Sequence, residues 1–214
     1  MTLGWDNPAE GPTTTVLLRH GDTDLSPEHR FSGLRDLPLS TNGTRQAKAA
    51  ACRLAAGAPI DALVSSPLQR AVATAAIAAS ELGLTATIDD DLRETDFGDW
   101  DGCTLTEIQE RWPAAAAAWR RDPHQAPPGG ESFADSAQRV DRARNRLLQN
   151  HGGQNVLVVS HITPIKILLC RALGVPLGTL YRLYLGSACI NEIQWHSRGF
   201  AAVHRVNDTS HLPD

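Results

Sequence analysis

The chain has 214 residues, of which 42% are hydrophobic and 21% are charged, and its formal net charge is -4. A chain of this length can bury a sizeable core in one domain without disulfides or metal ions, and its composition excludes collagen-like and low-complexity sequence. No apolar run reaches the roughly 18 residues of a membrane span. The acidic balance argues against non-specific binding to nucleic acid.

The ends of the chain and its cysteines bear on where the protein works. Residues 1–13 combine Asn, Pro, Gly and Thr without periodicity, so we expect a linker or disordered arm, and we expect a loose tail at 208–214. The first residues have neither the basic flank nor the apolar stretch of a signal peptide. The four cysteines form no C-x-x-C pair, which fits a reducing, cytoplasmic compartment.

Strands and helices are expected to alternate between these ends. Apolar, β-branched runs predict strands at 14–20, 61–66, 85–88 and 155–160. Helical spacing of apolar residues predicts helices at 40–57, 66–83, 104–119, 132–149 and 163–174, with a break or restart at Pro113. Ser66 and Thr163 each precede a proline and are the expected N-caps of their helices. Alternation at 188–195 and 200–206 predicts an antiparallel hairpin.

This order of elements predicts the fold class. Strands that alternate with helices and end in a hairpin predict a three-layer α/β/α sandwich, with a mostly parallel sheet and an antiparallel edge. The domain is expected to span residues 14–207, with 92–130 as an insertion or cap. Trp100, Trp112 and Trp119 are expected to pack the insertion against the sheet, or one of them to line a substrate site.

The residues at the ends of the predicted strands suggest a ligand site. In an open α/β sheet, ligands bind beyond the carboxyl ends of the strands. Arg19 and His20 end the first strand, Arg70 lies in the first turn after the second, and His161 follows the strand at 155–160. The planar guanidinium group of Arg can donate two hydrogen bonds to phosphate oxygens, and helix N-termini attract anions. This edge of the sheet is therefore predicted to bind a phosphate group. Gly21 is expected to turn the chain so that Arg19 and His20 face one pocket.

Each of these residues also has a purely structural interpretation. His20 and His161 can be core histidines with satisfied hydrogen bonds, and Arg70 can be an ion-pair partner on a helix surface. The occurrence of all four residues at predicted strand ends favours the phosphate site. No H-E-x-x-H, P-loop or G-x-S-x-G motif is present, so metalloproteases, P-loop NTPases and elbow-type serine hydrolases have no motif support.

Four segments together resemble a known family. They are Arg19-His20-Gly21, S-S-P-L-Q-R-A at 65–71, L-R-E-T-D-F-G-D-W-D-G at 92–102 and V-V-S-H at 158–161. In this order they resemble the histidine phosphatase superfamily, whose best-known members are the cofactor-dependent phosphoglycerate mutases. The resemblance covers nearly the whole chain and implies a phosphoglycerate-mutase-like fold. The segment 31–43 is similar to the family's substrate-side loop.

The resemblance also implies roles for single residues. His20 would be the nucleophile that forms a phosphohistidine, and Arg19, Arg70 and His161 would hold the phosphoryl oxygens. Glu94 matches the usual proton donor, with another acid such as Asp22 or Asp96 as the alternative. The residues expected on the substrate side are Ser26, Ser32, Gly33 and Ile162. Ser26 stands where many members have Asn, Asp101 where Glu is common, and Ile162 where Gly often follows the second His.

We therefore predict a phosphomonoester hydrolase of the acid phosphatase type that acts through His20 and needs neither a metal ion nor another cofactor. The S-H-I-T-P-I-K segment at 160–166 looks closer to acid phosphatases and α-ribazole phosphatases of cobalamin biosynthesis than to glycolytic mutases. A cofactor-dependent phosphoglycerate mutase and a non-catalytic module that binds phosphorylated ligands on the same fold are the alternatives.

The expected partner is a small phosphomonoester, with no membrane and no nucleic acid bound by this chain; a homodimer is an open alternative. Some relatives of this type form the C-terminal part of a bifunctional ribonuclease H–acid phosphatase. The linker-like opening suits a domain of such a protein, although a natural short arm would look the same.

Overall fold

The protein is described here by a computed structural model of residues 11–213. Residues 1–10 of the predicted arm lie outside the described residues, and Thr13 already belongs to the first strand. The strands are β1 (Thr13–Arg19), β2 (Ala62–Ser65), β3 (Ala86–Ile88), β4 (Asn155–Ser160), β5 (Ile190–Trp195) and β6 (Ala201–Asp208). The helices are α1 (Thr41–Ala55), α2 (Gln69–Leu82), α3 (Leu105–Arg111), α4 (Pro113–Arg121), α5 (Phe133–Asn150) and α6 (Ile162–Leu173).

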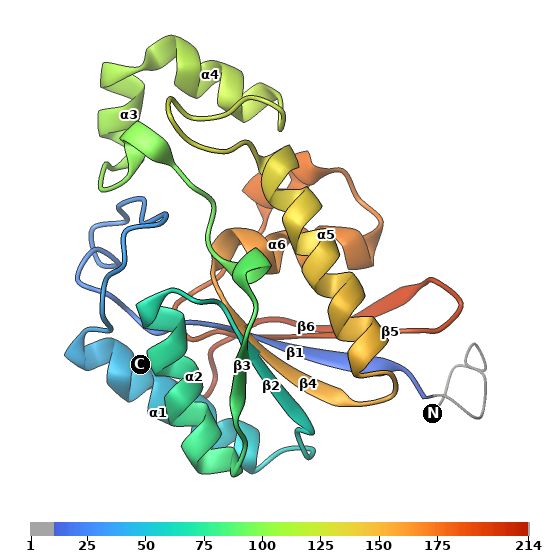
Figure 1. Cartoon of the computed structure of the whole chain (residues 1–214). Helices are drawn as coiled ribbons and strands as arrows, with labels where there is room; N and C mark the ends of the chain where they lie inside the picture. Colours follow the sequence, from blue (N-terminus) through green and yellow to red (C-terminus); the bar gives the residue numbers. More distant parts are fainter. Residues whose placement is uncertain (1–10, 214) are drawn as a thin grey trace.

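The six strands form one sheet in the order β3-β2-β4-β1-β5-β6 (Figure 1). β3, β2, β4 and β1 run parallel, and β5 and β6 add an antiparallel edge, as predicted. In the register of β1 with β4, Arg19 lies opposite Ser160. The two strands therefore end side by side, and their next residues, His20 and His161, emerge at the same edge of the sheet.

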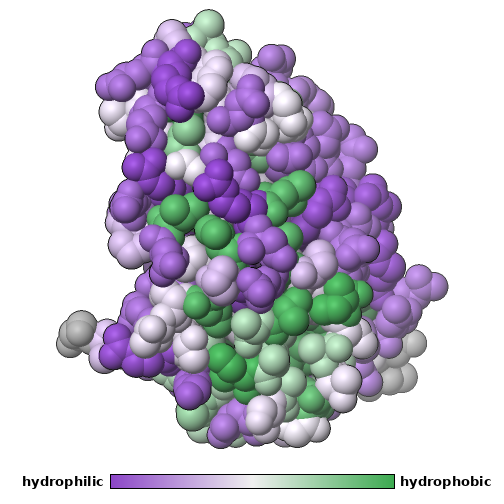
Figure 2. All heavy atoms as spheres, turned by 60° about the vertical axis from the view of Figure 1, so that its left-hand side comes forward, coloured by the Kyte–Doolittle hydropathy of each residue, from purple (hydrophilic) through white to green (hydrophobic). Residues whose placement is uncertain are grey.

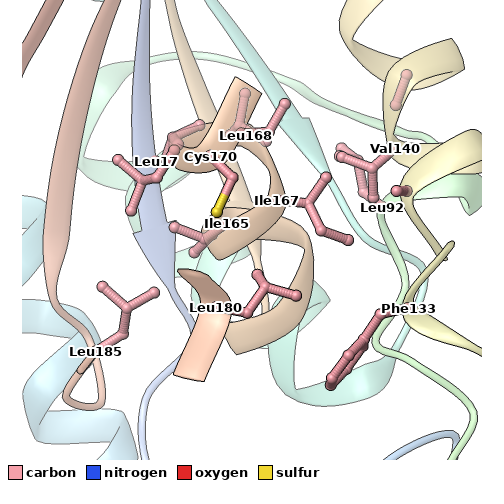
Figure 3. Packing of buried hydrophobic residues seen from close by; sticks show 14 of the residues in the cluster. Leu17, Leu92, Phe133, Val140, Ile165, Ile167, Leu168, Cys170, Leu180 and Leu185 are labelled. Atoms are coloured by element: carbon pink, nitrogen blue, oxygen red, sulfur yellow. The ribbon is translucent and has the colours of Figure 1, made fainter. Parts of the chain in front are cut away.

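Helices cover both faces of the sheet, which confirms the three-layer prediction. The alternation of side chains along β1 sends Val16 and Leu18 toward a core shared with α1 and α2. Leu17 points to the opposite face, into a core shared with α5 and α6. Figure 3 shows Leu17 in this second core together with Ile165, Leu168 and Cys170 of α6. Because β4 is buried on both faces, its sequence is a continuous apolar run rather than an alternating one.

The α1 and α2 layer leaves some apolar surface uncovered. Figure 2 brings this side of the molecule forward, and hydrophobic residues (green) form patches in its lower half, below a mostly hydrophilic upper part. Val72 of α2 and Ile88 at the end of β3 are among the exposed hydrophobic residues. None of the helices within residues 11–213 is long and apolar enough to cross a membrane.

Two predicted helix starts are wrong. α2 begins at Gln69 with Leu68 as its N-cap, and α6 begins at Ile162 with His161 as its N-cap. The hydroxyl of Ser66 is 2.7 Å from the Nε2 atom of His161 and also accepts a hydrogen bond from the backbone N–H of Leu68. Ser66 therefore forms a hydrogen bond with a histidine on another element, and it does not cap the helix that follows it.

The segment between β3 and α5 rises beyond the end of the sheet that carries His20 (Figure 1). It contains the short 3₁₀ turns η1 (Asp90–Leu92) and η2 (Gly98–Trp100), then α3 and α4. Pro113 begins α4, so the helix restarts rather than continues. Trp100 and Trp119 are buried with ring centroids 5.4 Å apart, whereas Trp112 is only half-buried and stacks under the guanidinium of Arg111.

The residues after β6, which were expected to be loose, lie against the body of the protein. His211 Nε2 is 3.1 Å from the carbonyl oxygen of Ala188, and Leu212 packs on the core of the α1 and α2 face. Leu212 and Pro213 also line the large cavity described below. The end of the described chain thus contributes to a wall of the candidate site.

Candidate active site

The two histidines named by the sequence lie together at the carboxyl edge of the sheet. The ring centroids of His20 and His161 are 5.0 Å apart. Arg19, the last residue of β1, faces the same cavity as His20, as predicted. Gly21 is required there by close packing, because a Cβ atom on it would collide with the backbone of Gly43 in the first turn of α1.

The hydrogen bonds of His20 fix its tautomer. Its Nδ1 atom is 2.7 Å from the carbonyl oxygen of Gly21, which can only accept, so Nδ1 carries the hydrogen. Its Nε2 atom then has a free lone pair and accepts a hydrogen bond from Nε of Arg70 at 3.2 Å. Burial lowers the pKa of His20 well below 6.5, and the charges of Arg70 and Arg19 lower it further. The ring is therefore neutral, with Nε2 able to act as a nucleophile.

Arg70 is fully buried, so the interpretation as a surface ion-pair partner is wrong. Its Nη1 atom donates to the carbonyl oxygen of Arg35 at 2.9 Å, and its Nη2 atom donates to those of Ser32 and Gly33 at 3.0 and 2.8 Å. These carbonyls hold the guanidinium plane while Nε faces His20. Arg70 thus joins the loop at 32–35 to the nucleophilic ring.

His161 lies behind His20 and is fully buried. Its Nε2 atom shares a hydrogen bond with the hydroxyl of Ser66, and its Nδ1 atom has no partner among the described residues. Burial lowers the pKa of His161 well below 6.5, followed by the charges of Arg70, His20 and Arg19. Sequence reasoning missed Ser66, although the second serine of the S-S-P signature is a signal that could have pointed to it.

Glu94 is buried at the cavity, where the first turn of α6 holds it. Its carboxylate accepts hydrogen bonds from the backbone N–H of Thr95 at 2.8 Å and from that of Thr163 at 3.3 Å. One of the backbone N–H groups that were expected to attract an anion at the start of α6 is therefore bound by a protein carboxylate. At α2, Asp36 accepts the N–H of Gln69 at 2.6 Å.

The two alternative acids are engaged elsewhere. Asp22 lines the cavity, but its carboxylate accepts hydrogen bonds from the side-chain amides of Asn42 and Gln46, each at 2.9 Å. Asp96 accepts the backbone N–H of Gly98 within its own turn and does not line the cavity. Glu94 is therefore the better placed carboxyl group for proton transfer.

The residues expected on the substrate side divide into two groups. Ser26, Ser32 and Ile162 line the cavity. Gly33 does not: its N–H donates to Asp101 at 3.2 Å, and a Cβ atom on it would lie 2.8 Å from the carbonyl oxygen of Thr95. Gly33 therefore shapes the loop that holds Arg70, and Asp101 fixes that loop from the other side.

A buried arginine that the sequence did not single out fixes the segment around Glu94. Arg139 of α5 forms an ion pair of 2.6 Å with Glu131, whose Oε1 atom also accepts the backbone N–H of Asp96. The same guanidinium donates to three carbonyl oxygens at 2.6 to 3.0 Å, those of Asp91, Arg93 and Glu94. Arg139 and Glu131 together hold the chain on both sides of Glu94.

The cavity above His20 has a volume of about 680 Å³, much more than a phosphate group occupies. Arg19, His20 and Glu94 line it, whereas Arg70 and His161 lie behind them. Its apolar wall is made by Phe31, Phe97, Trp119, Phe133 and Tyr181. Trp119 is thus the tryptophan of the predicted insertion that lines the site. Within residues 11–213, no three His, Cys, Asp or Glu side chains converge as a metal site.

Comparison with known proteins agrees with this geometry. The family model for the histidine phosphatase superfamily (branch 1) matches residues 15–209. The native structure of mycobacterial glucosyl-3-phosphoglycerate phosphatase Rv2419c has a TM-score of 0.82 and 33% identity, and the match covers 92% of this chain and 99% of that one.

The chain is also similar in sequence to several curated proteins. Bifunctional protein Rv2228c of Mycobacterium tuberculosis is 47% identical over 209 residues, which is 98% of this chain but 57% of that protein, so the chain spans little more than half of that relative. Glucosyl-3-phosphoglycerate phosphatase of the same organism is 45% identical over 85% of each chain. Adenosylcobalamin/alpha-ribazole phosphatase of Escherichia coli is 31% identical over 89% of this chain and 94% of that one. With the match over residues 15–209, the chain belongs to the histidine phosphatase superfamily.

Proposed function

We propose that this protein is a phosphomonoester hydrolase of the acid phosphatase type that works through a phosphohistidine on His20. The observation that carries the proposal is the hydrogen bonding of His20 at the cavity: Nδ1 donates to the carbonyl oxygen of Gly21, which leaves an unprotonated Nε2 facing Arg70. The relatives named as phosphatases support a hydrolase over a mutase or a non-catalytic module.

In the first step, Nε2 of His20 attacks phosphorus in line, and the bond from phosphorus to the oxygen of the leaving alcohol breaks. Phosphomonoester hydrolysis is among the slowest uncatalysed reactions, and a covalent intermediate divides it into two easier steps. Arg19 and Arg70 offset the charge on the phosphoryl oxygens. A bound phosphate dianion favours the protonated form of His161, which can then donate a hydrogen bond to it.

Glu94 handles the protons in both steps. It gives a proton to the oxygen of the departing alcohol and then takes one from the water that attacks the phosphohistidine. The balance is one ester and one water consumed, with one alcohol and one inorganic phosphate formed. His20 and Glu94 return to their starting states, so the scheme uses no metal ion or other cofactor.

The large cavity suits an alcohol bigger than a simple alkyl chain. Its aromatic wall offers apolar contacts to a ring or a sugar face. The name of the Escherichia coli relative makes α-ribazole phosphate one candidate substrate. The word bifunctional in the name of the 47% identical relative supports a second domain in a longer protein, and the ribonuclease H domain expected above remains a proposal.

A panel of phosphomonoesters tests the proposal. We expect release of inorganic phosphate from p-nitrophenyl phosphate and from at least one panel member (α-ribazole phosphate, sugar phosphates or phosphoglycerates), with no loss in excess EDTA. Absence of phosphate release from every compound would contradict a hydrolase. Efficient interconversion of 3- and 2-phosphoglycerate in the presence of the bisphosphate, with little phosphate release, would instead identify a mutase.

A further inference from the structure

The cavity wall contains a cation that the proposed phosphate chemistry does not use and that forms no ion pair with another residue of 11–213. Lys166 of α6 lines the cavity, and it is one of only two lysines in the chain, the other being Lys48 on the exposed face of α1. Among the described residues, Lys166 has neither a hydrogen bond nor an ion pair. The other two cations of the wall are engaged: Arg19 donates to the carbonyl oxygen of Leu185, and Arg30 pairs with Glu28 and Glu107.

The packing of α6 fixes the direction of this side chain. Ile165, Ile167 and Leu168 are buried in the core, and Figure 3 shows them around the axis of the helix. Ile162 and Lys166, four residues apart, form the half-buried stripe that faces the cavity. Side chains on a helix tilt toward its N-terminus. The ammonium group is therefore directed toward the N-terminal end of α6, where the backbone N–H of Thr163 binds Glu94.

This position lies on the leaving-group side of the phosphate site. Glu94 is the proton donor to the leaving oxygen in the proposed reaction, and Lys166 lies about one helical turn, roughly 5 Å, from the residue that binds Glu94. Burial lowers the pKa of Lys166 from 10.5, and the negative charge that Glu94 carries in its ionised form counteracts this effect. A half-buried ammonium group without a partner is costly, and an anionic ligand would offset that cost.

We propose that Lys166 binds a carboxylate on the alcohol part of the substrate, so that the preferred substrates are phosphate esters of hydroxy acids. This inference rests on the proposed function. A single ammonium group matches the single charge of a carboxylate, whereas a second phosphate group would call for several cations or an Arg fork. The carboxylate would stand a few bonds from the ester oxygen, between Glu94 and the aromatic wall.

Two substrates that differ only at the relevant group test this proposal. 3-Phosphoglycerate carries a carboxylate where glycerol 3-phosphate carries a hydroxymethyl group. We expect the wild type to show a higher kcat/KM for 3-phosphoglycerate, and Lys166→Met to reduce the ratio of the two values about tenfold, the size of one charge-assisted contact. Lys166→Arg should keep most of the preference. Lys48→Met, a matched loss of an exposed lysine that does not line the cavity, should leave the preference unchanged.

The outcomes separate this inference from the proposed function. An equal ratio in the wild type and Lys166→Met would overturn the role of Lys166 and leave the hydrolase intact. A wild-type preference for glycerol 3-phosphate over 3-phosphoglycerate would overturn the inference that the site binds a carboxylate. A preference for glycerol 1,3-bisphosphate over both of these compounds would overturn it as well. If the wild type released phosphate from other phosphomonoesters but from none of these compounds, the preference for hydroxy acids would fail and the hydrolase would stand. If it released phosphate from no phosphomonoester at all, the hydrolase would fail, and calorimetric affinities of the two compounds for the wild type and Lys166→Met would decide the binding role by the same comparison.

Discussion

His20 shows how local contacts prepare a side chain for nucleophilic attack. The carbonyl of Gly21 holds the hydrogen on Nδ1, and Arg70 and Arg19 disfavour the protonated ring. His161 is kept neutral in the same way, with Ser66 as its hydrogen-bond partner. Both effects favour a nucleophile that stays unprotonated in mildly acidic solution, which is the property an acid phosphatase needs.

The same two histidines predict a pH dependence of stability. In the unfolded chain their pKa values are near 6.5, whereas in the folded protein both are well below that. Below pH 6.5 the unfolded chain therefore binds protons that the folded protein does not, and stability falls. Each histidine should cost about 1 kcal/mol of unfolding free energy by pH 5.5. Urea denaturation at pH 7.5 and 5.5 measures this, and His161→Asn should reduce the difference by about 1 kcal/mol; an unchanged difference would contradict a buried neutral His161.

The role of Glu94 can be separated from that of Asp22 by the leaving group. Glu94→Gln should lower kcat/KM about 100-fold or more for alkyl phosphates, whose alkoxides need a proton. The loss should be less than about tenfold for 2,4-dinitrophenyl phosphate, whose leaving group needs none. Asp22→Asn should affect both substrates alike, since its carboxylate binds Asn42 and Gln46. A leaving-group dependence in Asp22→Asn instead of Glu94→Gln would reassign the proton donor.

At the level of elements, α5 holds the segment that carries Glu94. Arg139→Met should destabilise the protein by about 3 kcal/mol or more, because Glu131 and three carbonyl oxygens lose a buried partner. Arg142→Met is a matched control on the same helix: Arg142 also pairs with Asp91 but is 59% exposed, and its loss should cost less than about 1 kcal/mol. Chemical denaturation measures both values. Equal losses of unfolding free energy in the two variants would show that the buried contacts of Arg139 stabilise the protein no more than the exposed ion pair of Arg142.

The elements also show where sequence reasoning works and where it fails. β4 is a continuous apolar run because it is buried on both faces, and β5 alternates because it is buried mainly on one face. Both strands could therefore be predicted from the sequence. The starts of α2 and α6 could not, because Ser66 bonds to His161 and the backbone N–H of Thr163 to Glu94, partners distant in sequence. Local capping rules do not include such partners.

At the scale of the whole molecule, the site exists only because the sheet brings distant strands together. Arg19 and Ser160 are paired across β1 and β4, and the pairing sets His20 beside His161. The carboxyl-edge rule was sufficient to predict this gathering from the sequence. This rule could not identify Arg139 or Lys166. The helical pattern of a sequence looks the same whether an arginine or a lysine is exposed to solvent, binds buried carbonyl oxygens or faces a cavity.

The most direct test of the central claim is to trap the covalent intermediate. A radiolabelled phosphomonoester mixed with the enzyme and quenched with denaturant should leave a label on the protein that is labile in acid and stable in base, as a phosphoramidate is. Peptide mapping should place the label on His20, and His20→Ala should lose both the label and turnover. A His20→Ala protein that kept the label and the turnover would contradict the account.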